Sequence, residues 1–302
     1  VDIETARTYS DVLPTLNMVY ELNPDLLWRF AATKNVTRPS LGSLSYNASV
    51  SQTSGEAITS VSMGNPNLDP FESTNLDTAI EWYFEDVGYA SAAIFHKDID
   101  NFIVGTTTEV VYSTLGLPEE LLPADKNMDS IFYLERPENV DSSTIKGAEL
   151  AFSRDLDFLP APFNNLGVIA NYTYADGESL YRNIYGIEGN DQVKPFSGLS
   201  KNSYNFTLYY EVENWGARVS AAYRSRYGSG ATSSADQDES GYHGTTYVDF
   251  SSFYQLTDNV KLSLEGINLT NVREESYSDS HDRAYNTITS GRTVMLGITA
   301  QF

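Results

Sequence analysis

The sequence contains no cysteine, which excludes disulfide bonds and thiolate metal sites. It also lacks a long apolar run. Hydrophobic residues make up 41% of the 302, but no segment approaches the roughly 20 consecutive apolar residues of a membrane-spanning helix. Lys and Arg number 19 against 41 Asp and Glu, which gives a formal net charge of −22. Since nucleic acid is bound chiefly through Lys and Arg, we expect no nucleic-acid partner.

Histidine is scarce as well, with only His96, His243 and His281. None is paired at the spacing of a zinc site, such as H-x-x-x-H, and no Ser-His-Asp arrangement can be read from the sequence. We therefore expect no metal site, no cofactor and no enzymatic activity. The first residues, 1–5, lack the charged start and the apolar core of a secretion signal. The chain is thus expected to be either a soluble protein or the later part of a longer one.

Alternation of side chains is clearest in residues 293–302. Val294 and Leu296 fall on one side of an extended chain, and Thr293 and Thr299 fall on the other. Because successive side chains of a strand point to opposite faces, this segment is predicted to be a strand with one apolar and one mostly polar face.

The same alternation recurs along the chain and predicts eleven strands. Short turns follow the odd-numbered strands, and inserts of roughly 16 to 40 residues follow the even-numbered ones, which is the pattern of outer-membrane barrels. The predicted fold class is therefore all-β, a transmembrane antiparallel up-and-down barrel. The expected strands are 13–22, 26–37, 75–84, 89–103, 143–154, 165–176, 201–212, 217–227, 244–256, 260–271 and 293–302, and the inserts are 40–72, 105–142, 175–198, 228–243 and 272–288.

The second face of these strands favours a membrane barrel over a soluble sandwich. It carries too many charges for a dry core, because buried charge is costly unless paired, whereas a wet lumen solvates it. Aromatic residues near strand ends suit the two interfacial girdles of such barrels. The charged residues are Arg29, Glu81, Arg218, Arg224, Asp249, Lys261 and Glu265, and the girdle candidates are Tyr20, Trp28, Trp82, Tyr172, Tyr210, Trp215, Tyr223 and Tyr254.

Eleven is an odd number, whereas bacterial single-chain barrels have even strand counts. We therefore expect residues 1–302 to be a partial barrel domain, the carboxy-terminal part of a larger barrel. An isolated open sheet of this kind has two unpaired edges.

Several segments together resemble the TonB-dependent outer-membrane receptors, and the likeness extends over nearly the whole chain. The segments are Leu13-Pro-Thr-Leu-Asn-Met-Val-Tyr20, Arg29-Phe-Ala-Ala-Thr-Lys-Asn-Val-Thr-Arg-Pro39, Gly64-Asn-Pro-Asn-Leu-Asp-Pro70, Phe95-His-Lys-Asp-Ile-Asp-Asn-Phe102, Lys146-Gly-Ala-Glu-Leu150, Gly198-Leu-Ser-Lys-Asn-Ser-Tyr204, Gly266-Ile-Asn-Leu-Thr-Asn271 and the terminal Phe302. Together these segments resemble the proteobacterial branch of this family in which carbohydrate uptake is frequent.

The resemblance implies a 22-stranded barrel in the bacterial outer membrane, of which these are the last eleven strands. It also implies an amino-terminal plug domain and a box that contacts TonB, and both are absent from this sequence. Outer-membrane lipid and lipopolysaccharide, a small-molecule or oligosaccharide substrate, and TonB through the missing plug are the implied partners.

The acidic balance makes a neutral oligosaccharide the favoured substrate, because capture of an anionic ferric chelate is better served by an electropositive funnel. Loop aromatics and lumen-facing polar groups suit sugar recognition. The candidate substrate-binding residues are Tyr181, Tyr185, Phe196, Tyr227, Tyr242 and Tyr285, with Arg38, Asp98, Asn101, Arg224, Arg226 and Arg292.

Three further segments have simpler interpretations. Residues 64–70 are expected to form a turn that leads the chain into the third strand. Acidic clusters at Glu119, Glu120, Asp125 and Asp129, and at Asp236, Asp238 and Glu239, are expected to be solvated loops, although their oxygens also suit calcium.

Other functions stay open at the level of sequence. A siderophore or cobalamin receptor of the same family is the alternative substrate class. Two further alternatives are a passive porin-like or adhesive barrel, which lacks energised coupling, and a soluble β-binding protein, which needs no detergent to stay dissolved.

Overall fold

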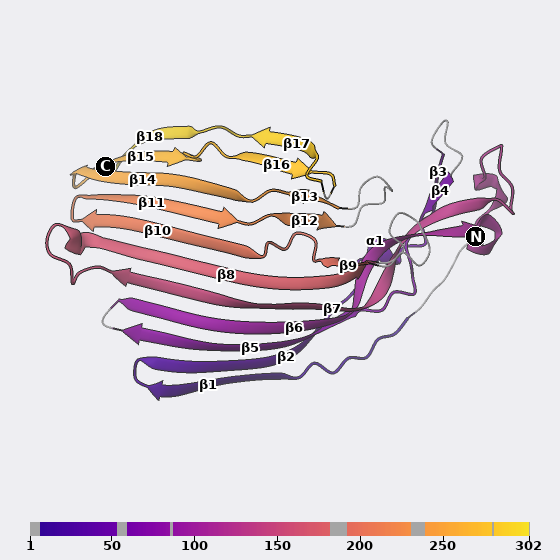
Figure 1. Ribbon diagram of the computed structural model, residues 1–302, viewed down its shortest axis with the longest axis horizontal. Helices are drawn as coiled ribbons and strands as arrows, with labels where there is room; N and C mark the ends of the chain where they lie inside the picture. The colour runs from indigo at the N-terminus through magenta and orange to yellow at the C-terminus, as the bar shows by residue number, and fades with distance from the viewer. Residues whose placement is uncertain are drawn as a thin grey trace.

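The computed structural model describes residues 7–52, 59–84, 87–181, 192–230, 239–279 and 281–301. Its main feature is a 14-stranded sheet in which the strands follow one another in chain order (Figure 1). Three of the 14, β3, β4 and β9, lie off the main path, which leaves the eleven antiparallel strands that the sequence predicts. These are β1 (Thr15–Asn23), β2 (Leu26–Thr37), β5 (Phe71–Phe84), β6 (Gly88–Val111), β7 (Ile131–Asp155), β8 (Leu166–Tyr181), β10 (Asn202–Val212), β11 (Trp215–Arg224), β14 (Thr245–Thr257), β15 (Val260–Ile267) and β18 (Thr293–Ala300).

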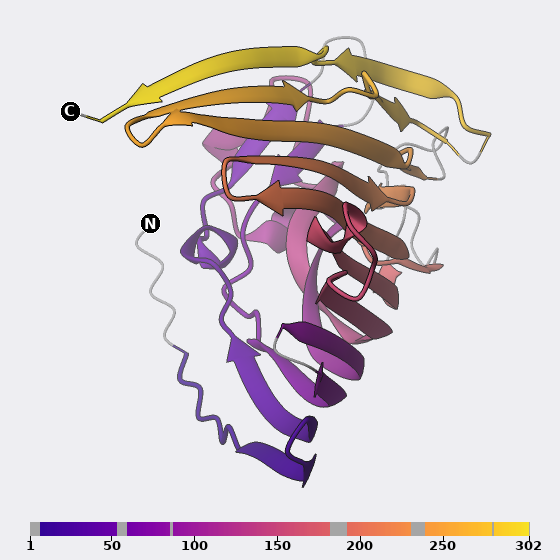
Figure 2. The ribbon, with the colours of Figure 1, turned by 90° about the vertical axis from the view of Figure 1, so that its left-hand side faces the viewer.

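The sheet is curved and open, with β1 at one edge and β18 at the other (Figure 2). The connections β1–β2, β7–β8, β10–β11 and β14–β15 all lie at the left-hand end in Figure 1. The long connections lie at the opposite end. This segregation of short and long connections confirms the up-and-down architecture.

Pairing register places side chains of one kind on the same face. Val219 of β11 lies opposite Leu208 of β10 and Phe250 of β14, and its neighbour Arg218 lies opposite Tyr209 and Ser251. We call the face that carries Val219 the apolar face and the face that carries Arg218 the polar face.

The apolar face is uncovered. Ile94 is 61% exposed and Leu296 is 79% exposed, whereas large aliphatic side chains of a soluble protein are mostly buried. Within the described residues, none of the helices combines the length and the apolar character needed to cross a membrane.

The expected insert 105–142 is wrong at both ends, because β6 runs on to Val111 and β7 begins at Ile131. These two strands stay in register over their whole length, and Val111 lies opposite Ile131. Thr106–Thr108 and Val110–Val111 are β-branched residues that favour extended structure. Only residues 112–130 connect the strands, with two short 3-10 helices at Tyr112–Leu115 and Glu119–Leu121.

The tip of the β6–β7 hairpin has a small hydrophobic core, which we call the distal module. The hairpin β3 (Ser49–Gln52) and β4 (Thr59–Ser62) packs on it, and β4 pairs in parallel with β7. The buried side chains are Val61, Met63, Tyr112, Leu115, Leu117, Phe132 and Leu134. Insert 40–72 thus contributes the strands β3 and β4, and it also contains the short helix α1 (Leu41–Leu44).

The expected turn at 64–70 is confirmed. The Asn65 side chain accepts a hydrogen bond from the Asn67 amide at 3.0 Å and donates one to the Pro137 carbonyl at 3.0 Å. Leu68 is fully buried. The segment therefore fastens the chain to β7 before β5 begins.

Two other inserts also contain strands, which the sequence analysis did not predict. Segments β12 (Tyr227–Gly230), β13 (Ser240–Tyr242), β16 (Arg273–Tyr277) and β17 (Ala284–Thr289) pair in this order as a second, four-stranded sheet. It continues the main sheet beyond β11, β14, β15 and β18 (Figure 1). One more short strand, β9 (Gln192–Pro195), pairs with the end of β8.

Candidate functional site

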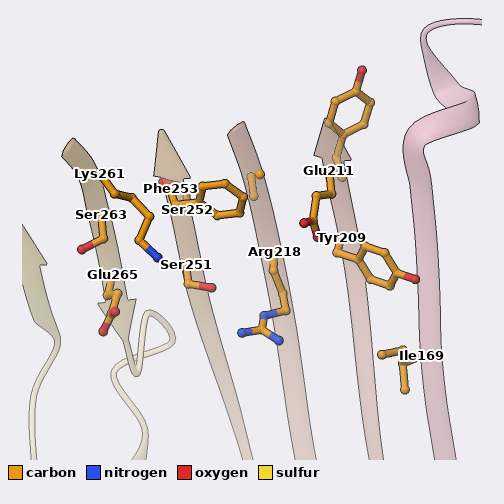
Figure 3. A pocket seen from close by; sticks show the side chains of 13 residues that line it. Ile169, Tyr209, Glu211, Arg218, Ser251, Ser252, Phe253, Lys261, Ser263 and Glu265 are labelled. Carbon is orange, nitrogen blue, oxygen red and sulfur yellow. The ribbon is translucent and has the colours of Figure 1, made fainter. Parts of the chain in front are cut away.

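A pocket of about 570 Å³ lies on the polar face near the short turns (Figure 3). We call it the polar-face pocket. Strands β10, β11, β14 and β15 contribute its wall, because their register places alternate residues on this face. The side chains that define it are Tyr209, Glu211, Arg218, Ser251, Phe253, Lys261, Ser263 and Glu265.

Glycines in neighbouring strands position the two aromatic rings of this pocket. Gly167 of β8 lies opposite Tyr209, and a Cβ atom at Gly167 would approach the ring to 2.1 Å. Gly216 has the same relation to Phe253, at 2.6 Å. Each ring thus packs across the bare backbone of the adjacent strand. The Tyr209 ring can lie over Gly167 because Gly167 has no side chain of its own.

The charges in this pocket have no ionic partner in the described part of the chain. Glu211, Arg218 and Glu265 form no ion pair there, and the Lys261 ammonium lies 5.7 Å from the centroid of the Phe253 ring. A polar face of this kind suits water or a second polar surface rather than an apolar ligand.

A second cleft of about 280 Å³ lies where the two sheets meet, at the end with the long connections. We call it the seam cleft. Strand β8, the β9 segment and the chain before β10 form one wall, and β12, β13 and β16 form the other. Its lining includes Asp176, Lys194, Leu199, Lys201, Arg226, Tyr227, Glu239, Ser240 and Tyr277.

Arg226 connects three segments around the seam cleft. Its guanidinium donates to Asp282 at 2.8 Å and to Glu239 at 2.5 Å, and it lies 3.9 Å from the centroid of the Tyr277 ring. Burial lowers the pKa of Arg226, but the hydrogen bond with Tyr277 and the two carboxylates outweigh it, so the net pKa is raised. The side chain is therefore a permanent cation whose charge is already balanced.

The other cations of the cleft are engaged as well. Lys201 forms an ion pair with Asp176 at 2.9 Å, and Lys194 also has interaction partners. The seam cleft consequently presents hydroxyls, an amphipathic aromatic wall and paired charges rather than an excess of positive charge.

Four of the predicted substrate residues gather at or beside the seam cleft. Arg226 and Tyr227 line it. Arg224 lies 3.7 Å from the centroid of the Tyr227 ring, and Tyr242 stacks on the same ring at 5.2 Å between centroids. The face of Tyr227 is thus used within the protein, whereas Tyr242, 39% exposed, ends the stack.

The other described candidates lie elsewhere. Phe196 packs edge-on against Phe102, at 5.1 Å between centroids. Arg292 donates to the Leu269 carbonyl at 2.8 Å and holds a turn, Arg38 is exposed after β2, and Tyr285 is 76% exposed on β17. None of these four lines the seam cleft.

The register corrects the face of one polar candidate, Asp98, and the structure defines the backbone of a second, Asn101. Asp98 was expected on the lumen side, but it shares the apolar face with Ile94 and His96, because residues two apart on β6 point the same way. Asn101 has a φ of 57°, and its carbonyl accepts a hydrogen bond from Asn139 at 2.7 Å. Asn101 therefore has a backbone role at this position.

Two candidates are not placed. The side chain of Tyr181 and the whole of Tyr185 lie outside the described residues, as do Asp236 and Asp238 of the second acidic cluster. Glu119 and Glu120 are exposed on a short 3-10 helix. Over the described ranges, no group of three or more His, Cys, Asp or Glu is arranged to hold a metal ion.

The sequence analysis missed Asp176, Lys194, Lys201 and Tyr277 as cleft residues. Asp176, Lys194 and Lys201 come from one region of the sequence, whereas Tyr277 comes from a distant one, and the pairing of β13 with β16 and of β8 with β9 brings them together. Strand alternation alone carries no signal for this proximity. By contrast, the charges of the polar-face pocket could be found from alternation.

Comparison with known proteins agrees with this architecture. Residues 2–269 match the family described as TonB dependent receptor-like, beta-barrel. Among solved structures, a mutant of the ferric enterobactin receptor of Pseudomonas aeruginosa is 17% identical with a TM-score of 0.64, over 96% of this chain and 40% of that one. A siderophore receptor of Acinetobacter baumannii is 16% identical with a TM-score of 0.65, over 96% and 41%.

A copper transporter is also similar, 18% identical with a TM-score of 0.60, over 95% of this chain and 39% of that one. At these identities the likeness shows the fold alone. The chain spans about 40% of the length of the solved receptors that it matches. Proteins of this family are receptors and transporters of the outer membrane rather than enzymes.

Proposed function

This chain belongs to the family of TonB-dependent receptors, and from that premise we propose that it forms the carboxy-terminal half of a barrel in the bacterial outer membrane. The whole receptor takes up a nutrient and is energised by TonB through a plug domain that this sequence does not include. The uncovered apolar face supports the membrane position, because lipid satisfies it and water does not.

The two edges of the sheet support closure by further strands. Every residue of β1 is exposed, and β18 is exposed at all positions but one. An unpaired edge exposes a row of backbone donors and acceptors, which the bilayer core cannot solvate. Eleven more strands, as in the resemblance to a 22-stranded barrel, remove both edges.

The polar-face pocket supports contact with a polar domain inside the barrel. Two cations and two carboxylates without ionic partners among the described residues line it. Charges in a lumen are stabilised either by water or by complementary charges on a plug. Its position near the short turns suits a contact at the periplasmic end of the barrel.

For the substrate we propose a neutral oligosaccharide, and one observation carries the proposal: the seam cleft has aromatic and hydroxyl groups but no surplus cation. Lys201 and Arg226 are already paired with carboxylates. An anionic ferric chelate gains little from such a surface, whereas sugar hydroxyls exchange hydrogen bonds with paired ions and a sugar ring can stack on the exposed ring of Tyr242 beside the cleft.

The test is calorimetry on the whole receptor purified in detergent, with neutral oligosaccharides and a ferric catecholate as ligands. Tyr242→Ala should weaken oligosaccharide binding about tenfold, the effect of one good aromatic contact. Tyr254→Ala, an exposed tyrosine at the short-turn end, is the matched control and should leave the affinity unchanged. Binding of the ferric catecholate alone overturns the oligosaccharide assignment.

Energised uptake is tested separately in cells. We expect uptake of the bound ligand in a strain with TonB and none in a strain without it. Equal uptake in both strains identifies a passive, porin-like barrel instead.

A further inference from the structure

The distal module contains an open cleft of about 770 Å³, which we call the distal cleft. The module lies at the end of the molecule opposite the short turns (Figure 1). The distal cleft shares no lining residue with the seam cleft, and its volume falls within the roughly 300–1,000 Å³ of small-molecule sites. It is therefore large enough to hold a ligand of its own.

Strand register forms one wall of the distal cleft. Because β3 pairs with β4, β4 with β7 and β7 with β6, one row of residues crosses four strands, and all its members line the cleft. The members of this row are Ser49, Ser62, Glu135 and Thr107. The preceding residues Val61 and Leu134 belong to the hydrophobic core, so the row points to the opposite face of these strands. It presents three hydroxyls and one carboxylate there.

The segment 40–47, which includes α1, forms a second wall with Ser43 and Asn47. Gly64 allows this wall to approach β4, because a Cβ atom at Gly64 would lie 2.1 Å from the Ser45 carbonyl oxygen. The Asn65 amide also donates a hydrogen bond to the Ser43 carbonyl at 2.7 Å. Backbone contacts thus preform the distal cleft.

Glu135 gives the distal cleft an unbalanced negative charge. Its side chain is exposed and has no ion pair or hydrogen bond within the described ranges. The other charged residue of the lining, Arg136, is paired with Glu138 at 2.9 Å. The three hydroxyls of the row likewise have no hydrogen-bond partner among the residues that the structure describes. One carboxylate and several hydroxyls are consequently available to a ligand.

We propose that the distal cleft binds a polyhydroxylated ligand with one protonated amino group, the chemistry of an amino-sugar residue. The Glu135 carboxylate accepts a charge-assisted hydrogen bond from the ammonium group, which is stronger than a bond between neutral groups. The hydroxyls of the row exchange hydrogen bonds with the ligand hydroxyls. This site is additional to the seam cleft and does not depend on the nutrient proposed for that cleft.

The composition of the lining selects this class of ligand. An anion is repelled by Glu135, and a neutral sugar leaves that carboxylate without a partner. Recognition by stacking needs an aromatic ring, and none of the described lining residues is aromatic. A calcium ion takes six to eight oxygen ligands and favours several carboxylates, whereas Glu135 is the single free carboxylate of the described lining.

The test is calorimetry on the whole receptor in detergent, with the β-1,4-linked disaccharide of glucosamine as the probe. All titrations use a Tyr242→Ala background, so that binding at the seam cleft is weakened. Glu135→Gln should lower the affinity about tenfold, the effect of one hydrogen bond to a charged group. Its affinity for the di-N-acetylated disaccharide, which has no charge, should equal that of the background.

Glu119→Gln is the matched control, because it makes the same change of charge on an exposed 3-10 helix of the distal module, outside the cleft. It should bind the glucosamine disaccharide as the background does. Gly105→Leu tests the cleft without altering Glu135. A Cβ atom at Gly105 meets no atom within 4 Å, so the leucine side chain enters the cleft and should lower the affinity at least tenfold.

Background affinity in Glu135→Gln or in Gly105→Leu overturns the proposal, as does a glucosamine disaccharide that does not bind. An equal loss of affinity in Glu119→Gln and Glu135→Gln overturns it too, because the net charge of the module then explains the binding. A seam cleft that binds only a ferric catecholate contradicts the proposed nutrient and leaves these results unaffected. The two sites can therefore fail separately.

Discussion

Single residues explain what particular segments of this chain do. Asn268, within Gly266-Ile-Asn-Leu-Thr-Asn271, is nearly buried and has a φ of 56°. Its side chain accepts from the Val272 amide at 2.9 Å and donates to the Gly291 carbonyl at 2.9 Å. Asparagine tolerates this backbone region and offers both a donor and an acceptor. The motif thus closes the end of β15 and fastens it to the start of β18.

At the same scale, Arg226 is expected to hold the second sheet on the first. Arg226→Ala removes two ion pairs and the contact with Tyr277. Exposed pairs contribute roughly 0–1 kcal/mol each, so global stability should change little while the amides of β13 and β16 exchange several-fold faster. Hydrogen exchange measures this directly.

Arg273→Ala is the control for this experiment, because Arg273 lies on the same sheet with a loose, 3.9 Å contact to Glu275. Equal exchange in both variants contradicts the role of Arg226. Amide exchange in β13 that is slower in Arg226→Ala than in the wild type contradicts it as well.

Among the elements, the β6–β7 hairpin differs most from a simple barrel strand pair, since it carries its own core outside the membrane. Tyr112 is fully buried there, and its hydroxyl donates to the Pro118 carbonyl at 2.8 Å. Burial, with a smaller effect of Glu120, raises the pKa of the Tyr112 phenol. The distal module therefore needs this phenol in its neutral form.

The sign of the pH dependence follows from that shift. Because the folded pKa is raised, the stability linked to Tyr112 is present below the unfolded pKa of about 10 and is lost as the pH rises through the folded value. Tyr112→Phe should lower stability of the distal module by about 1 kcal/mol at neutral pH, through the lost hydrogen bond. It should also remove part of the loss above pH 10.

Limited proteolysis of residues 112–130 as a function of pH measures both effects. Tyr133→Phe is the comparison, because burial also raises the pKa of that phenol, but its hydroxyl interacts with Glu109 instead. An alkaline profile of Tyr112→Phe that matches the wild type contradicts the assignment.

For the whole molecule, the decisive property is that one sheet has two different environments on its two faces. Phe206→Lys places a charge on the apolar face, which costs about 2–4 kcal/mol near the middle of a bilayer. Asn205→Lys places the same charge on the polar face one residue earlier and should cost little. Folding of the whole receptor into lipid vesicles, followed by heat-modifiable gel mobility, separates the two variants.

Equal folding yields for Phe206→Lys and Asn205→Lys contradict the membrane position of the apolar face. A receptor that stays dissolved and compact without detergent does so too. Both outcomes leave the strand order itself unaffected, since that order depends on backbone pairing.

The alternation of side chains determined by itself the eleven strands on the main path of the large sheet, their two faces and the segregation of short and long connections. It does so because alternation is local: a residue such as Asp98 has the same parity as Ile94 whatever the rest of the chain does. Its assignment to the apolar face was therefore accessible from sequence, and the polar character of the side chain led the prediction to the wrong face.

Tertiary structure alone decided which distant segments meet. The extended β6–β7 ladder, the second sheet and the seam cleft depend on pairing between inserts, and Asp176, Arg226 and Tyr277 come together only when that pairing is complete. Inserts obey no shared periodicity, and their contacts are set by hydrogen-bond register and by cores such as Tyr112 with Phe132. That is why the barrel was predictable and the cleft was not.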